Sequence, residues 1–226
     1  MSVVDHASLL RRLSENGWEL NVLYDVGANI GRWSIEAQRV LPGARFELFE
    51  PLVGRYKPVD DAVRFSQIRD YGLHPVALSD ENKTDNIKLL GNMGVGSSIL
   101  LLDADRRKDI PLIECDYARM DDIVAAKGLR APDFIKLDTQ ASELRILKGA
   151  VETLKKNKFV LVETWMRRSY GPETPLFHEL ANFMYEQDYI LYEIILSEGR
   201  DPDGTLRWFD AVFQNKAFSR FDAAQL

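Results

Sequence analysis

The sharpest chemical pattern in the sequence is a glycine turn at residues 25–31. Gly27 and Gly31 lie four positions apart there, and Asp25 precedes the first glycine by two positions. An apolar run ends at this turn and a run with helical spacing begins. Glycines at such a junction allow a tight turn and a close approach of the backbone to a ligand, while the helix N-terminus offers oriented N–H groups. We therefore expect Asp25, Gly27, Ala28, Asn29 and Gly31 to form a ligand cradle.

The turn is not that of a dinucleotide site. The third and sixth positions counted from Gly27 hold an asparagine and an arginine, so the Gly-x-Gly-x-x-Gly pattern is missing. This disfavours an NAD-dependent oxidoreductase, which remains an alternative function. The other interpretation is that Gly27 and Gly31 only form a tight turn and bind no ligand.

Glu50 is the second signal, and it directly follows the apolar run 44–49. In a doubly wound fold, an acidic side chain at this point reaches the hydroxyls of a ribose. A carboxylate accepts two hydrogen bonds from a vicinal diol but repels a 2′-phosphate, which excludes NADP. Glu50 could instead be a surface acid, but together with the glycine turn it favours an adenosine-containing ligand.

Asp138 is the predicted catalytic base. It follows the apolar run 133–137, and open α/β sheets bind their ligands at the carboxyl ends of such strands. Lys136, two residues earlier, shares a strand face with Asp138 and is predicted to pair with it and keep it ionised. A purely structural ion pair is the alternative. Asp138 could also hold a metal, but one carboxylate together with the Gln140 amide makes a weak metal site. We therefore predict no metal.

Four further polar residues are predicted to contact a substrate: Gln140, Glu143, Glu163 and Arg167. Each has an alternative role. Glu143 begins a predicted helix and suits its dipole as a capping acid. Glu163 ends a predicted strand and could simply be a polar residue at the sheet edge with no role in binding. Arg167 belongs to an arginine pair that could grip an anion or could simply be solvated.

These positions imply the elements that carry them, because strand-like and helix-like patterns alternate from residue 21 onward. The predicted strands cover residues 21–26, 44–49, 73–78, 84–90, 133–137, 159–162, 189–196 and 206–213. The predicted helices cover residues 30–41, 120–127 and 175–187, and another begins at residue 142. Such alternation indicates a doubly wound α/β fold with a mostly parallel sheet. The turn between the last two strands is too short for a parallel crossover, so they should form an antiparallel hairpin.

The ends and the composition set further limits. Residues 1–20 are predicted to form a helical extension with Leu9, Leu10 and Leu13 on one side, before a domain at residues 21–226. The chain has 226 residues, 46% of them hydrophobic, and a net charge of −6, which argues against nucleic acid as a partner. No apolar run is long enough for a membrane span. Cys115 is the single cysteine, so no internal disulfide can form and a cytoplasmic location is expected.

The combined pattern resembles the FkbM-type S-adenosylmethionine-dependent methyltransferases. The segments that carry the likeness are residues 25–31, 49–51 and 133–150, with weaker matches at residues 75–79, 96–98 and 209–213. The resemblance implies a Rossmann-like, seven-stranded class I methyltransferase fold with the last strand antiparallel. It implies that residues 27–31 wrap the methionine part of the cofactor and that Glu50 holds its ribose. It also implies that Ala77, Leu78 and Ser79 lie near the adenine.

The chain departs from the family pattern at Gln140 and Ala141, where relatives often carry a glutamate or glutamine followed by glycine. The alanine side chain is expected to narrow the acceptor entrance, and Gln140 cannot take up a proton. Residues 91–111 have a loop composition and are a candidate lid. The expected function is O-methylation of a hydroxyl on a sugar, glycan or polyketide-like small molecule. A non-catalytic adenosyl-nucleotide-binding module is the alternative, and the sequence leaves the oligomeric state open.

Overall fold

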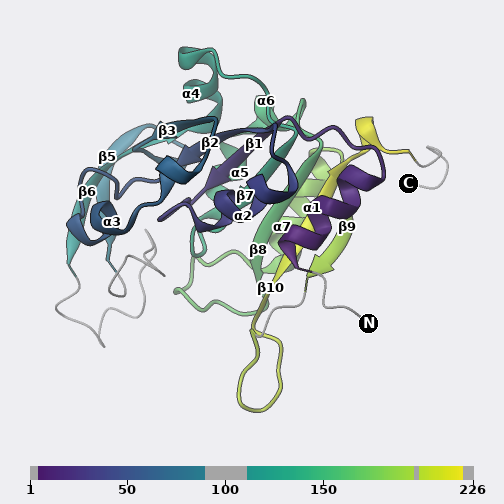
Figure 1. Cartoon of the computed structure of the whole chain (residues 1–226). Coiled ribbons are helices and arrows are strands. Elements are labelled where there is room, and N and C mark those ends of the chain that lie inside the picture. Colours follow the sequence, from purple (N-terminus) through teal and green to yellow (C-terminus); the bar gives the residue numbers. More distant parts are fainter. Residues whose placement is uncertain (1–4, 90–110, 196–198, 221–226) are drawn as a thin grey trace.

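The computed structural model describes residues 5–89, 111–195 and 199–220. Its described strands form one seven-stranded and one three-stranded sheet, and helices cover both faces of the larger sheet (Figure 1). The candidate lid at residues 91–111, apart from its last residue, and the segment 96–98 lie outside the described residues.

The larger sheet has the order β3-β2-β1-β7-β8-β10-β9. Its strands are β1 (Val22–Val26), β2 (Arg45–Phe49), β3 (Tyr71–His74), β7 (Phe134–Leu137), β8 (Phe159–Trp165), β9 (Tyr189–Ile195) and β10 (Trp208–Asn215). The five strands from β3 to β8 pair in parallel, while β10 pairs antiparallel with both β8 and β9. The predicted doubly wound fold with a C-terminal antiparallel hairpin is confirmed.

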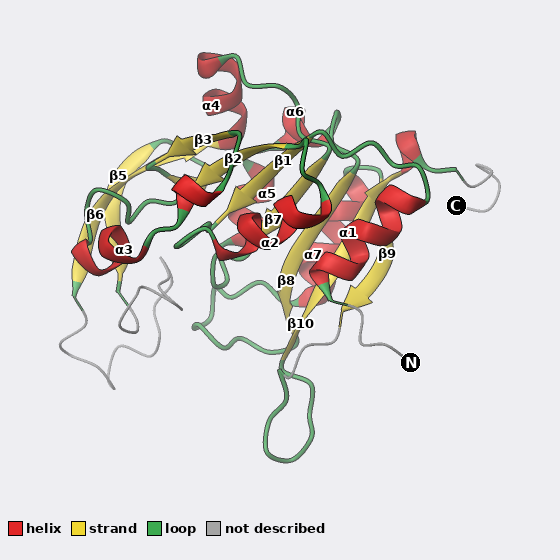
Figure 2. Ribbon diagram, in the orientation of Figure 1, coloured by secondary structure: helices red, strands yellow, loops and turns green. Residues whose placement is uncertain are grey.

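Helices lie on both faces of this sheet (Figure 2). They bury its apolar side chains in two cores. On one face lie α1 (His6–Glu15) and α2 (Arg32–Val40), which share a core with Phe134, Phe159 and Leu161. The other face is covered by α4 (Met120–Lys127), α5 (Glu143–Lys148), α6 (Val151–Leu154) and α7 (Phe177–Glu186). Short helices α3 (Lys57–Ala62), η1 (Phe65–Gln67) and η2 (Lys216–Phe218) complete the fold.

The N-terminal helix packs directly on the domain. Leu9, Leu10 and Leu13 are buried in the same core as α2, as their spacing predicts. The Arg12 guanidinium pairs with Glu193 on β9, and His6 lies 3.0 Å from an Asp210 carboxylate oxygen on β10. None of the described helices is long and apolar enough to cross a lipid bilayer.

The single strand predicted at residues 73–78 is wrong. The structure has two strands there, β3 in the larger sheet and β4 (Ala77–Ser79) in the smaller one. Pro75 lies between them and has no N–H to donate to a strand ladder, so the chain turns and the Val76 N–H donates to the His74 carbonyl. The smaller sheet, β4-β6-β5, also contains β5 (Lys83–Lys88) and β6 (Leu112–Arg119), and the single sheet expected from the sequence did not include it.

Candidate functional site

The glycine turn joins β1 to α2 at the carboxyl edge of the larger sheet. Gly27 has a φ of +74°, and a Cβ added there would lie 2.1 Å from the Asp138 carbonyl oxygen. Gly31 has a φ of +85°, and its Cβ would lie 2.7 Å from the Phe65 ring. The N–H groups of Gly27 and Ala28 both donate to the Phe49 carbonyl. The fold itself therefore requires glycine at both positions, whatever the turn binds.

Glu50 lies against this turn. Its Oε2 accepts the Asn29 N–H at 2.8 Å and its Oε1 accepts the Leu52 N–H at 2.9 Å. Burial raises the pKa of the Glu50 carboxyl, although the two N–H groups act in the opposite direction. The turn and the acid are thus joined by a direct hydrogen bond, at the same edge of the sheet.

A buried ion pair lies under the turn. Lys136 on β7 donates to Asp25 Oδ1 on β1 at 3.0 Å and to the Gly27 carbonyl at 3.1 Å. Asp25 Oδ2 also accepts the Ser34 hydroxyl from α2 at 2.7 Å. Burial opposes the charge on Lys136, but the neighbouring carboxylates of Asp25 and Asp138 outweigh burial and raise its pKa. The predicted pairing of Lys136 with Asp138 is present at 3.8 Å, but Asp25 is the closer partner.

Asp138 directly follows β7 at the carboxyl edge of the larger sheet, and its side chain is 49% exposed. The Gln140 amide donates to Asp138 Oδ1 at 3.0 Å and reaches Glu163 Oε2 at 3.4 Å. The Tyr170 hydroxyl donates to the Gln140 amide oxygen. Three predicted site residues therefore meet at one point. Tyr170 joins them from a loop, where no periodic signal in the sequence marked it.

Two more carboxyl groups surround Asp138, and both are buried. Glu143 Oε1 accepts the Thr139 N–H at 2.8 Å and the Ala141 N–H at 3.3 Å, so it clamps the loop ahead of α5. Burial raises the pKa of Glu143 to about 7. Burial, followed by the charge of Asp138, raises the pKa of Glu163 to about 10. At neutral pH Glu163 therefore carries a proton and offers an O–H donor at this edge.

Arg167 is not part of this cluster. Its guanidinium pairs with Asp201 at 2.5 Å and its side chain is 56% exposed. Ala77, Leu78 and Ser79 lie in the smaller sheet with buried side chains, so a contact to a ligand there would come from main-chain atoms.

The departure from the family pattern at residues 140 and 141 falls on two residues with unusual backbone angles. Gln140 and Ala141 both have positive φ, +57° and +77°, a region that favours glycine. The Ala141 side chain is 2% exposed, packs with Trp165 and also lines a cavity beside α5. The expected narrowing of the acceptor entrance by Ala141 stays a prediction.

Cys115 is a buried residue of strand β6. Burial raises the pKa of its thiol to about 11, which keeps it protonated and unreactive. Among the described residues, no group of three or more histidine, cysteine, aspartate or glutamate side chains has the geometry to hold a metal ion.

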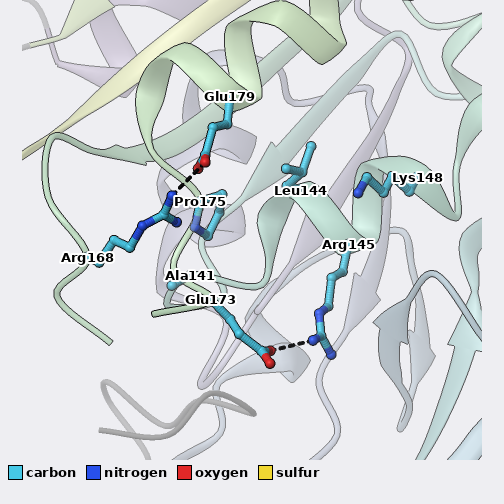
Figure 3. Close-up of a pocket in the computed structure, with 8 residues that line it drawn as sticks. All are labelled: Ala141, Leu144, Arg145, Lys148, Arg168, Glu173, Pro175 and Glu179. Atoms are coloured by element: carbon cyan, nitrogen blue, oxygen red, sulfur yellow. Dashed lines mark hydrogen bonds and ion pairs between the residues drawn. The ribbon is translucent and has the colours of Figure 1, made fainter. Parts of the chain in front are cut away.

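A cavity of about 240 Å³ lies beside this cluster, between α5 and the segment that leads into α7 (Figure 3). Its lining combines three cationic side chains with two carboxylates and an apolar floor. The residues are Ala141, Leu144, Arg145, Lys148, Arg168, Glu173, Pro175 and Glu179. Ala141 is common to the cavity wall and to the loop that carries Gln140.

Comparison with known sequences matches the part of the chain that contains the glycine turn, Glu50 and Asp138. The sequence profile of the methyltransferase FkbM domain matches residues 25–191. The AMB antimetabolite synthetase AmbE of Pseudomonas aeruginosa is 29% identical over 179 residues, which cover 65% of this chain and 8% of that protein. The 31-O-demethyl-FK506 methyltransferase FkbM of Streptomyces tacrolimicus is 27% identical over 159 residues, covering 57% of this chain and 59% of that protein. This chain thus matches less than two thirds of the length of either relative.

Solved structures share the fold. The methyltransferase FkbM from Methylobacillus flagellatus KT has a TM-score of 0.50 and 20% identity, covering 86% of this chain and 43% of that one. The O-methyltransferase TomG from Streptomyces achromogenes, in complex with SAM, has a TM-score of 0.51 and 12% identity, covering 95% of this chain and 82% of that one. At these identities the likeness supports the class I methyltransferase fold and no finer statement.

Proposed function

Because the chain belongs to the methyltransferase FkbM family, we propose that it transfers a methyl group from S-adenosylmethionine to a hydroxyl of a small molecule such as a sugar, glycan or polyketide. One observation carries this proposal. Lys136 contacts Asp25 and the Gly27 carbonyl on the cofactor side and Asp138 on the acceptor side. A single buried cation thus connects the predicted cofactor cradle to the predicted base.

The residues of the cradle fit an adenosyl group. Glu50 is a buried carboxylate, and each of its oxygens receives one backbone N–H. A carboxylate has about four acceptor positions, so a ribose diol can add its two hydroxyl donors. In this proposal residues 27–31 hold the methionine part. When bound, S-adenosylmethionine supplies a methyl group that is already activated by its positive sulfur.

The protein's remaining task is to position and deprotonate the acceptor. Asp138 is half-exposed and accepts the hydroxyl proton, while the Gln140 amide holds its other oxygen. A well-placed base typically contributes about 10²–10⁴-fold to the rate. Protonated Glu163 donates a hydrogen bond to the acceptor beside it. Positioning supplies the rest, roughly 7–11 kcal/mol for well-oriented groups.

The names of two relatives support an oxygen acceptor. FkbM from Streptomyces tacrolimicus is named as a 31-O-demethyl-FK506 methyltransferase, and TomG is named as an O-methyltransferase. Because the matched lengths are partial and the identities low, the oxygen acceptor is part of our proposal for this chain.

Two measurements test the proposal. Calorimetric titration of the full chain with S-adenosylhomocysteine should show saturable binding, and no binding at millimolar concentration would refute it. Incubation with methyl-labelled S-adenosylmethionine and a library of hydroxyl compounds should then give a labelled product that Asp138→Ala abolishes. Cofactor binding without any product that depends on Asp138 would favour the non-catalytic module instead.

A further inference from the structure

The cavity beside α5 carries charges that methyl transfer to a hydroxyl does not require. We propose that this cavity binds a phosphate group of the acceptor, remote from the hydroxyl that receives the methyl group. The inference rests on the function proposed above and adds a substrate class to it, a phosphorylated or phosphodiester-containing acceptor.

The cavity has an excess of positive charge. Arg145 pairs with Glu173 at 2.5 Å, and Arg168 pairs with Glu179 at 2.6 Å. Lys148 pairs with no carboxylate in the described part of the chain, and Figure 3 shows its ammonium pointing into the cavity. The lining therefore carries one net positive charge, concentrated on the α5 side.

The arginines keep donors available for a ligand. A guanidinium has five N–H donors, and the Arg145–Glu173 contact uses one terminal nitrogen of Arg145. Arg168 is fixed more firmly, because it also donates to the Thr174 carbonyl at 2.5 Å. An exposed ammonium beside planar guanidinium groups suits the three oxygens of a phosphate better than the two of a carboxylate.

The size of the cavity indicates part of a ligand rather than a whole one. Its volume of about 240 Å³ lies just below the ~300–1,000 Å³ of pockets that enclose a complete small molecule. Leu144 and Pro175 give it an apolar floor, against which the carbon chain next to a phosphate can lie.

The position of the cavity connects it with the acceptor side of the site. Ala141 lines the cavity and directly follows Gln140, whose amide donates to Asp138. Tyr170 lies in the same loop as Arg168 and donates to Gln140. An acceptor with its phosphate in the cavity therefore lies next to the loop that holds the predicted base.

Titration of the full chain with inorganic pyrophosphate, followed by amide chemical shifts, tests the inference. We expect saturable shifts at Leu144, Arg145 and Lys148. Lys148→Met should weaken this binding by about ten-fold, as expected for the loss of one charge-assisted hydrogen bond. The matched control is Lys155→Met, which removes the same charge from an exposed lysine paired with Glu152. It should leave pyrophosphate binding unchanged.

The outcomes separate this inference from the proposed function. S-adenosylhomocysteine should bind the wild type and Lys148→Met equally and should not displace pyrophosphate. Shifts located elsewhere, equal weakening by Lys155→Met, displacement by S-adenosylhomocysteine, or equally tight binding of succinate would each overturn the phosphate site while leaving the proposed methyl transfer intact. Pyrophosphate binding in a chain that fails to bind S-adenosylhomocysteine would overturn the acceptor role of the cavity together with the proposed function.

Discussion

The ammonium of Lys136 lies 3.0 Å from Asp25 Oδ1, across the pairing of β7 with β1. Both side chains are almost completely buried, at 5% and 0% exposure. The pair stands directly beneath the glycine turn and shares its lysine with Asp138. Its position makes it both a structural requirement of the fold and the link between the two halves of the proposed site.

Replacing Lys136 with methionine should strongly destabilise the protein. The change leaves the Asp25 carboxylate buried without its cation, a loss that typically costs about 3–5 kcal/mol. Urea unfolding of the two proteins measures it. Lys155→Met, at an exposed pair, should change the free energy of unfolding by less than about 0.5 kcal/mol. Adding Asp25→Asn to Lys136→Met should recover part of the loss, and equal losses in the two lysine variants would contradict the expectation.

Gly27→Ala should destabilise the chain by at least about 2 kcal/mol, since it combines a positive φ with a steric clash. The new Cβ would lie 2.1 Å from the Asp138 carbonyl oxygen, so either the turn or the loop after β7 must move. Binding of S-adenosylhomocysteine should fall with it. Gly43→Ala is the matched control, because no atom lies within 4 Å of its added Cβ. Thermal unfolding measures the stability of both variants, and calorimetric titration measures their binding of S-adenosylhomocysteine. Equal results for Gly27→Ala and Gly43→Ala would contradict the prediction.

Glu50→Gln should weaken S-adenosylhomocysteine binding by about ten-fold or more, the loss of a charge-assisted hydrogen bond. The amide keeps one acceptor oxygen, so either the Asn29 or the Leu52 N–H then faces an NH₂ group. Glu36→Gln makes the same chemical change on an exposed, half-solvated side chain of α2 and should not affect binding. Unchanged affinity in Glu50→Gln would remove Glu50 from the predicted ribose contact.

The free energy of unfolding of Glu163→Gln should increase relative to that of the wild type as the pH rises. The pKa of Glu163 is about 10 in the folded chain against an ordinary value of 4.5, so between these values the native state holds a proton that the unfolded state has lost. The contribution of Glu163 to the free energy of unfolding therefore falls as pH increases, by at most about 1.4 kcal/mol per pH unit.

The glutamine variant has no such proton, so its stability relative to the wild type should rise between pH 5 and pH 8. Urea unfolding at several pH values measures this difference. Glu152→Gln, on an exposed carboxylate, should follow the wild type at every pH. A stability difference between Glu163→Gln and the wild type that does not vary with pH would show that Glu163 is ionised in the native state.

Much of the fold could be predicted from the sequence because its signals are local. The alternation of apolar strands with amphipathic helices, and the short turn before β10, indicated the parallel sheet and the terminal hairpin, which the structure confirms. The division of residues 73–78 was missed although Pro75 marked it, because the apolar run on both sides looked continuous. The smaller sheet was missed because its central strand, β6, was not among the predicted strands, so β4 and β5 had no partner to pair with.

Part of the site could likewise be predicted from the sequence, and part could not. Residue types placed Asp25, Glu50 and Asp138 at the ends of strands, and the parallel topology then required those ends to share one edge. The spacing in the sequence paired Lys136 with Asp138, and only the strand register brought Asp25 closer to it. Tyr170 carried no such signal, since its contact with Gln140 depends on how a loop folds back over α5.

The sequence by itself determined most strands and helices of the larger sheet and which chemical groups stand at the strand ends, since both follow from local spacing and residue type. Only the tertiary structure decided that Lys136 prefers Asp25 to Asp138, that Ala141 faces inward, and that three cations surround one cavity. Those outcomes depend on packing between segments distant in the chain. Burial then sets which charges need partners, and no local pattern encodes the distances on which that choice rests.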